Sequence, residues 1–172
     1  MRVTAVLLAV CLAAACGDPV ANNAAPPARP PAVRMPEGAF ILGATDIPVM
    51  LRQCSRQTPP PGEGSWQPGT ADILAFEAAL PAELARHPFA GIIWSRWPRD
   101  WRRQYVGIVR GGRRFIYGNF IPLDPDRTGP PPALPGRHEE PIIICDGGRA
   151  FFGAEYDVAA GRVTQIAFNG PG

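Results

Sequence analysis

Between residues 73 and 84, apolar residues recur at the spacing of a helix. The stripe that repeats at steps of three and four consists of Ile73, Phe76, Leu80 and Leu84. Thr70 suits the N-cap of the predicted helix, and Asp72 suits its first turn, where a carboxylate interacts favourably with the helix dipole. Pro81 removes an amide and clashes with the carbonyl of Glu77, so the helix is kinked there or a second short helix begins at Pro81. His87-Pro88 ends the element.

From Tyr105 onward the pattern changes to runs of β-branched and aromatic residues. Residues 105–110 and 113–120 flank Gly111-Gly112, which predicts a hairpin with a two-residue turn. Three more runs predict strands, at residues 142–145, 150–157 and 162–168. Asp146-Gly147-Gly148 is expected to turn the chain between the first two of these, because aspartate and glycine tolerate a positive φ angle. An amide nest for an anion is the alternative at this turn.

The order of these elements predicts an α+β fold. One helix is followed by five strands that are mostly joined by short turns, which favours an antiparallel β-sheet of about five strands. The kinked helix is expected to pack on one face of that sheet. Residues 58–69 and 123–137 are rich in proline and glycine and are interpreted as loops.

The first residues have the pattern of an export signal. Arg2 precedes an apolar run over residues 3–12, and small residues then lead to Cys16. The run is too short to span a bilayer as a helix. The segment resembles a bacterial lipoprotein signal with residues 12–16 as its lipobox, which predicts removal of residues 1–15 and lipidation of Cys16. An ordinary secretory signal with an incidental cysteine is the alternative.

Composition divides the rest of the chain into a tether and one domain. Residues 16–37 are rich in proline and alanine and have no apolar period, which predicts a semi-extended tether. Residues 38–172 have the length of a single domain. A hydrophobic fraction of 46% is sufficient for a core. The expected location is therefore the cell envelope, with the domain held to a membrane by the N-terminal lipid and facing the periplasm.

Four cysteines fall into two pairs. Cys11 lies in the signal and Cys16 would carry the lipid, which leaves Cys54 and Cys145. In an oxidising compartment such a pair is expected to form a disulfide. It would close a loop of about ninety residues, for which the chain-entropy model gives roughly 4–5 kcal/mol. Two free thiols or a metal-binding pair are the alternatives.

Several short motifs within residues 52–170 carry a resemblance to a known group. They are RQCSR (52–56), Trp66 with Pro68, QYVGI (104–108), RRFIYGNF (113–120), CDGG (145–148), FFG (151–153), Tyr156-Asp157 and FNG (168–170). The chain resembles a group of small proteobacterial lipoproteins through them, which implies an exported lipoprotein and brings no activity. The helix-plus-sheet order is also similar to cystatin-like and PepSY-like domains, which have binding and inhibitory roles; that similarity concerns the fold alone.

Charge concentrates in one segment. The net charge of +2 is too small to indicate nucleic acid as a partner, and all basic residues are arginines. Residues 96–114 contain seven arginines and one aspartate, a net charge of +6. Tryptophans interleave with them at helical steps, so a surface for an anionic glycan, a lipid headgroup or a protein partner is expected. Its candidate binding residues are Trp94, Trp97, Trp101, Arg99, Arg102 and Arg103. The alternative is a core role for the tryptophans and a solvated or hairpin-edge role for the arginines.

Signals for catalysis or metal binding are weak. The two histidines, His87 and His138, have no sequence-evident nucleophile beside them, and no catalytic residue is assigned. Residues 124–129 partly match a calcium loop, but Pro135 stands where a bidentate glutamate is needed, so a turn is favoured. His138-Glu139-Glu140 could hold a divalent metal, although three adjacent residues do not all point at one ion. No metal or cofactor is therefore assigned.

The sequence leads to three hypotheses of function. The first is a non-catalytic binding module for an anionic envelope component or a partner protein. The second is an enzyme that acts on envelope polymers through paired carboxylates, drawn from Glu77, Asp146, Glu155 and Asp157. The third is a protein inhibitor or immunity-type protein, suggested by the small size, the anchor and the expected disulfide.

Overall fold

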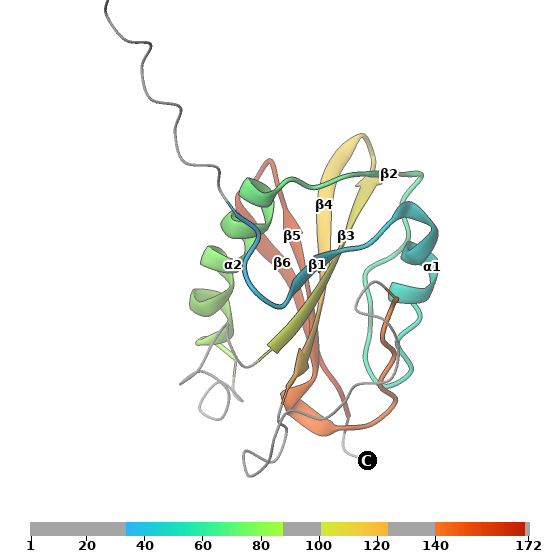
Figure 1. The fold of residues 1–172 in the computed structure, drawn as a ribbon, viewed down its shortest axis with the longest axis vertical. Helices are drawn as coiled ribbons and strands as arrows, with labels where there is room; N and C mark the ends of the chain where they lie inside the picture. Colours follow the sequence, from blue (N-terminus) through green and yellow to red (C-terminus); the bar gives the residue numbers. More distant parts are fainter. Residues whose placement is uncertain (1–33, 88–100, 124–139, 171–172) are drawn as a thin grey trace, which may run out of the picture. The chain divides into compact units, whose positions relative to one another are not determined.

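The computed structural model describes residues 34–87, 101–123 and 140–170, and these form an α+β fold with one mostly antiparallel sheet (Figure 1). Within the described residues the sheet has six strands. They are β1 (Ala39–Ile41), β2 (Gly64–Trp66), β3 (Trp101–Arg110), β4 (Arg113–Pro122), β5 (Phe152–Asp157) and β6 (Arg162–Phe168). The path through the sheet is β1-β3-β4-β5-β6, and β2 also pairs with β3. Only the β1–β3 pair among these is parallel.

The β3–β4 hairpin is the centre of the sheet and confirms the predicted hairpin. Its ladder runs without a break from the Trp101–Pro122 pair to the Arg110–Arg113 pair. Gly111 and Gly112 form the turn with φ angles of 57° and 70°, which residues with side chains rarely adopt. The strands start earlier and end later than the aromatic and β-branched runs indicated.

Helix α2 (Thr70–Leu84) packs on one face of the sheet, as predicted (Figure 1). The N-cap is Gly69 rather than Thr70, and the Gly69 amide donates to the Asp72 carboxylate at 2.8 Å. One helix runs through Pro81, so no second helix begins there. The helix ends only three residues later, so few turns follow the interrupted hydrogen bond.

An aromatic core fills the space between α2 and the sheet. The ring of Phe76 stacks on Tyr156 with centroids 5.2 Å apart, and Phe120 stacks on Phe152 at 4.4 Å. The predicted helical stripe supplies the α2 side of this core, and all four of its residues are fully buried. Burial of this apolar face is what holds α2 against the sheet.

One ion pair is buried inside this apolar core. Arg103 of β3 approaches the carboxylate of Glu77 on α2, with Nε 3.1 Å from Oε1. The Tyr105 hydroxyl donates to the same oxygen at 2.6 Å, and Arg103 Nη2 also donates to the carbonyl of Glu37. Burial raises the pKa of Tyr105 well above its usual range, and the adjacent Glu77 carboxylate raises it further. The contact therefore links the helix, the central strand and the start of the domain.

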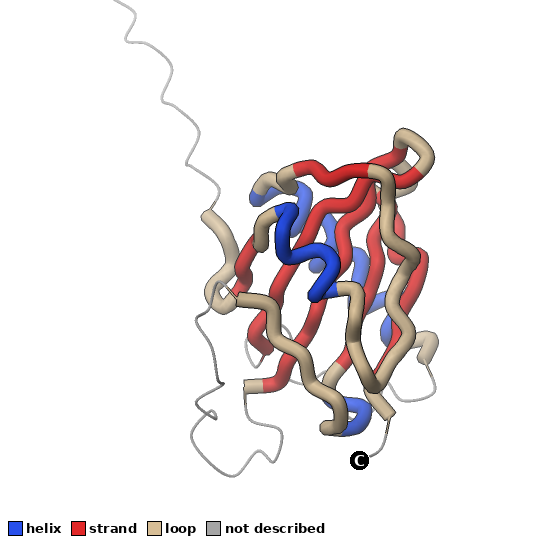
Figure 2. The backbone as a smooth tube through the Cα atoms, turned by 90° about the vertical axis from the view of Figure 1, so that its right-hand side faces the viewer, coloured by secondary structure: helices blue, strands red, loops and turns tan. Residues whose placement is uncertain are grey.

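The other face of the sheet is covered mainly by irregular chain. Helix α1 (Ile47–Met50), a 3₁₀ turn at Ala44–Asp46 and the segments 51–63 and 140–147 lie across it (Figure 2). A smaller apolar cluster lies beneath α1 and contains Met50, Val106, Ile108, Phe115 and Tyr117. We call segments 51–63 and 140–147 the cover of this face.

The predicted strand at 142–145 is wrong. The chain is extended there but joins no ladder, and Ile143 is 41% exposed. The reason is that carbonyls in this segment accept hydrogen bonds from side-chain amides: Ile142 from Asn119, and Ile144 from Asn169. Strands β1 and β2 and helix α1 were not predicted as elements, because each has only three or four residues.

Replacing Glu77 with glutamine should strongly destabilise the fold. The substitution keeps the shape of the side chain but leaves the buried Arg103 cation uncompensated, which is expected to cost about 3–5 kcal/mol of unfolding free energy. The matched control is Glu83→Gln on the same helix, where the partner Arg86 is 73% exposed and the cost should be well under about 1 kcal/mol. Urea unfolding measures both. Equal stability of the two variants would contradict a structural role for the Glu77–Arg103 pair.

Candidate binding groove

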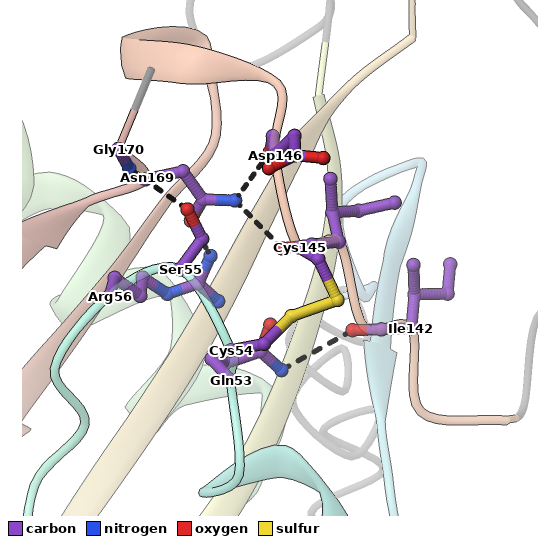
Figure 3. The surroundings of a disulfide bond; sticks show 10 residues. Gln53, Cys54, Ser55, Arg56, Ile142, Cys145, Asp146, Asn169 and Gly170 are labelled. Atoms are coloured by element: carbon purple, nitrogen blue, oxygen red, sulfur yellow. Dashed lines mark hydrogen bonds between the residues drawn. A yellow bond between two sulfur atoms is a disulfide. The ribbon is translucent and has the colours of Figure 1, made fainter. Parts of the chain in front are cut away.

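The Cys54–Cys145 disulfide joins the two segments of the cover and confirms the predicted pairing (Figure 3). The Cα atoms of the two cysteines are 4.9 Å apart, and both residues are solvent-exposed. On either side of the bond, hydrogen bonds join segment 51–63 to segment 140–147 and to the chain that follows β6. Gln53 Nε2 donates to the carbonyl of Ile142 at 3.4 Å, and the amide of Gly170 donates to the carbonyl of Ser55 at 3.0 Å.

Arg56 is the polar centre beneath the cover. Its guanidinium is buried and donates to three neutral oxygens. Nη1 contacts Asn169 Oδ1 at 2.6 Å, Nη2 contacts Asn119 Oδ1 at 2.5 Å, and Nε contacts the Tyr117 hydroxyl at 3.3 Å. Burial raises the pKa of Tyr117, and the positive charge of Arg56 acts in the opposite direction. One side chain therefore connects segment 51–63 to β4 and to the end of β6.

Asn119 and Asn169, which accept hydrogen bonds from Arg56, also donate hydrogen bonds to segment 140–147. Asn169 Nδ2 donates to the carbonyls of Ile144 and Asp146, both at 2.9 Å (Figure 3). Gln104 accepts from the amide of Ile142 at 3.0 Å and donates to the carbonyl of Glu140 at 2.6 Å. The irregular segment 140–147 is thus fixed by side chains in place of a strand partner.

A groove of about 710 Å³ opens beside the first half of the cover. One wall is α1 with the preceding 3₁₀ turn, and the other is residues 58–65. The lining residues are Ala44, Ile47, Pro48, Leu51, Arg52, Thr58, Pro59, Pro60, Pro61, Gly62, Glu63, Gly64 and Ser65. Most of this surface is apolar, and the three consecutive prolines have no backbone amide to donate. The groove is therefore a rigid, largely apolar channel at the edge of the molecule where β2 lies.

Two charged residues line the groove, and they differ in their partners. The Glu63 carboxylate accepts from the amides of Gly111 and Gly112 at 3.0 and 2.9 Å. These backbone hydrogen bonds lower its pKa. Arg52 is exposed and donates Nε to the carbonyl of Pro48 at 3.1 Å, and no carboxylate of the described residues pairs with it. The groove therefore carries one charge of each sign, and Arg52 is the cation that has no carboxylate partner among the described residues.

The candidate binding residues of the basic and aromatic segment do not form an exposed surface where the structure describes them. Trp94, Trp97 and Arg99 lie outside the described residues. Residues 101–105 belong to β3, so Trp101 and Tyr105 lie on a strand although their spacing also fits a helix. Trp101, Arg102 and Arg103 are 6%, 9% and 1% exposed.

The strand also separates these three side chains. Trp101 and Arg103 face α2, where Trp101 Nε1 donates to the carbonyl of Ala150 at 3.3 Å and Arg103 pairs with Glu77. Arg102 faces the opposite side, because successive residues of a strand alternate. The three candidate residues therefore do not share one binding surface.

The carboxylates considered for acid–base chemistry do not line the groove. Glu77 is paired with Arg103 beneath α2. Glu155 contacts Arg110 through both carboxylate oxygens, at 2.9 and 2.8 Å, and Asp157 is paired with Arg113. Asp146 is exposed, and Gly147 and Gly148 follow it with positive φ angles of 97° and 65° before a short 3₁₀ turn. The predicted turn chemistry is present, but it leads into β5 without a preceding strand.

Metal-binding motifs are not supported within the described residues, which contain no cluster of three or more histidine, cysteine or acidic side chains suited to a metal. The partial calcium-loop match at 124–129, where a turn is favoured, and His138 lie outside those residues. The ring of His87 packs against Phe168 with centroids 4.9 Å apart. No helix in the same described ranges is long and apolar enough to span a bilayer.

The groove itself was missed at the sequence level. Residues 58–62 (TPPPG) were interpreted only as a loop. Three adjacent prolines could have indicated a stiff apolar wall, but nothing in the sequence shows that this wall faces α1.

Comparison of the chain with protein-family models, with curated proteins and with solved structures finds no match. What the groove binds is therefore argued from its own shape and charge.

The Glu63 contact should be lost in acid. Since the backbone hydrogen bonds hold the folded-state pKa of Glu63 below its ordinary value of 4.5, the contact is present at neutral pH and disappears as the pH falls through the lowered pKa. The amide chemical shifts of Gly111 and Gly112 should titrate with a midpoint below 4.5. The Glu63→Gln variant should lack this titration. A midpoint at or above the ordinary value would show that the carboxylate does not hold the hairpin turn.

Proposed function

We propose that this protein is a non-catalytic binding module whose groove receives an extended, largely apolar segment of a partner protein. The observation that carries the proposal is the groove between α1 and residues 58–65. Its volume of about 710 Å³ lies within the range of roughly 300–1,000 Å³ that is usual for ligand sites. Its apolar walls and few polar groups also fit the composition of such sites.

A rigid wall favours binding of an extended segment. The proline residues of the wall fix their backbone φ angles, so little conformational entropy is lost when a ligand binds. The surface of the groove is mainly apolar, so burying aliphatic or proline side chains of the partner there would lower the free energy of the complex. Arg52, which no described carboxylate pairs with, would suit a carboxylate on that segment.

The envelope location remains part of the proposal. It rests on the export signal at residues 1–15, on Cys16 as the lipidated residue and on the tether at 16–37. The exposed Cys54–Cys145 disulfide supports an oxidising compartment, because thiols in the cytosol are kept reduced. The lipid would hold the domain at a membrane facing the periplasm, and its partner would be another envelope protein.

An inhibitor or immunity-type role is one form of this proposal, since either would also act through a partner protein. Binding to an anionic surface through the tryptophan and arginine segment has less support, because its described candidate binding residues, Trp101, Arg102 and Arg103, are buried. Catalysis by paired carboxylates has less support too, because arginines engage Glu77, Glu155 and Asp157 and none of these carboxylates lines the groove.

Filling the groove should abolish binding of peptides. Ser65 is exposed and lines the groove, so Ser65→Trp places a bulky ring inside it. The matched control is Ala78→Trp, an exposed position on α2 over the opposite face of the sheet. Linear peptides are first selected from a random displayed library on the wild-type domain, and their affinities are then measured by fluorescence anisotropy. The selected peptides should lose at least about tenfold in affinity, or about 1.4 kcal/mol, with Ser65→Trp and should bind Ala78→Trp unchanged.

Two results would contradict the proposal. The first is selection of peptides that bind both tryptophan variants as well as the wild type. The second is failure of repeated selections to yield any peptide that binds the folded domain.

A further inference from the structure

Arg102 is a buried cation that has no ion-pair partner among the described residues. Its side chain lies on β3, on the covered face of the sheet, opposite Ile121 of β4. The residue is 9% exposed, and its Nη1 atom is inaccessible to solvent and makes no hydrogen bond. No carboxylate within the described ranges forms an ion pair with it.

The other buried and half-buried arginines of the described residues have partners. Arg103 pairs with Glu77, and Arg110 pairs with Glu155. Arg56 carries no carboxylate partner either, but three oxygen atoms accept its hydrogen bonds. Arg102 therefore differs from its neighbours in lacking both a counter-charge and a complete set of acceptors.

Charge is unevenly distributed on the covered face. Near the hairpin turn the cations of Arg110 and Arg113 are matched by Glu155 and Asp157. At the other end of the strands the described residues place Arg102 with no paired carboxylate. Glu140 lies on this side, where its backbone carbonyl accepts from Gln104 while the residue itself is exposed. An anion would therefore meet positive charge at the Arg102 end of the face.

Burial of an isolated guanidinium is unfavourable. Loss of hydration lowers the pKa of Arg102, yet an arginine side chain stays protonated in proteins and cannot escape the cost by losing its proton. The planar guanidinium presents paired donors that match a carboxylate or phosphate group. A small oxyanion would supply both the charge and the acceptors that Arg102 lacks.

We propose that Arg102 is the binding residue for a small oxyanion, either a carboxylate or a phosphate group. Gln104 is its neighbour two residues along the same face of β3, and the apolar side chain of Ile121 lies opposite. The site is separate from the groove, because Arg102 does not line it. Failure of either proposal therefore leaves the other standing.

The test compares Arg102→Met, which keeps a long apolar side chain and removes the charge, with the wild type. Thermal unfolding is followed in sodium chloride, sodium phosphate and sodium acetate at equal ionic strength. Phosphate or acetate should raise the wild-type midpoint saturably, because a ligand that binds only the folded state stabilises it. The Arg102→Met midpoint should lack this saturable rise and keep only the general salt effect of the anion. Arg162→Met, at an exposed position of β6, should respond as the wild type does.

The two anions separate the two chemistries. A rise with phosphate alone assigns a phosphoryl ligand, and a rise with acetate alone assigns a carboxylate ligand. Equal shifts in the wild type and in Arg102→Met would overturn the proposal. So would a clear loss of stability of Arg102→Met in chloride, because it would show that Arg102 already has a partner within the fold.

A second readout does not depend on a folded variant. The side-chain Nε–Hε signal of Arg102 should shift saturably as phosphate or acetate is added to the wild-type protein. A signal that does not move with either anion would also overturn the proposal.

Discussion

The covered face of the sheet depends on the guanidinium of Arg56. This group is buried, and three side-chain oxygens from β4 and from the end of β6 accept its hydrogen bonds. Leaving such donors unpaired would cost free energy, so the three acceptors and the arginine require one another. Asn119 and Asn169 then use their remaining amide donors to fix the carbonyls of segment 140–147. The network orders a stretch of chain that has neither helix nor strand.

The two faces of the sheet are therefore stabilised by different physics. Helix α2 is held by an apolar stripe packed on aromatic rings, with one ion pair inside the core. The cover is held by polar side chains and by the disulfide, which joins its two halves at the surface. The hydrogen bonds that Arg56 donates fix the chain just before residues 58–65. The proline wall of the groove is therefore anchored at its start. Binding in the groove is proposed to use that rigidity.

Local signals in the sequence predicted the local parts of the structure. Three elements were predicted from patterns within their own residues, and the structure contains all three. They are the apolar stripe of α2, the glycine turn of the β3–β4 hairpin and the strand at 162–168. The disulfide was predicted because Cys54 and Cys145 are the two cysteines left after the signal and the lipid site, and an oxidising compartment was expected. The strand predicted at 142–145 is wrong because it was based on composition alone. Asn119 and Asn169, which are distant in sequence, donate hydrogen bonds to the carbonyls of this segment. The groove and the separation of Arg102 from Arg103 arise from strand alternation and from segments far apart in the chain, which no short pattern reveals.

Hydrogen exchange of an Arg56→Lys variant tests most directly whether this guanidinium orders the cover. Lysine keeps the positive charge but cannot reach three acceptors with a planar fork. The account predicts that amides in segments 51–63 and 140–147 lose protection together, while the β3–β4 ladder stays protected. Arg52→Lys, an exposed change four residues away, should leave protection of segment 140–147 at the wild-type level. Unchanged protection of both segments in Arg56→Lys would show that the disulfide and the apolar contacts suffice, and would contradict the central role given to Arg56.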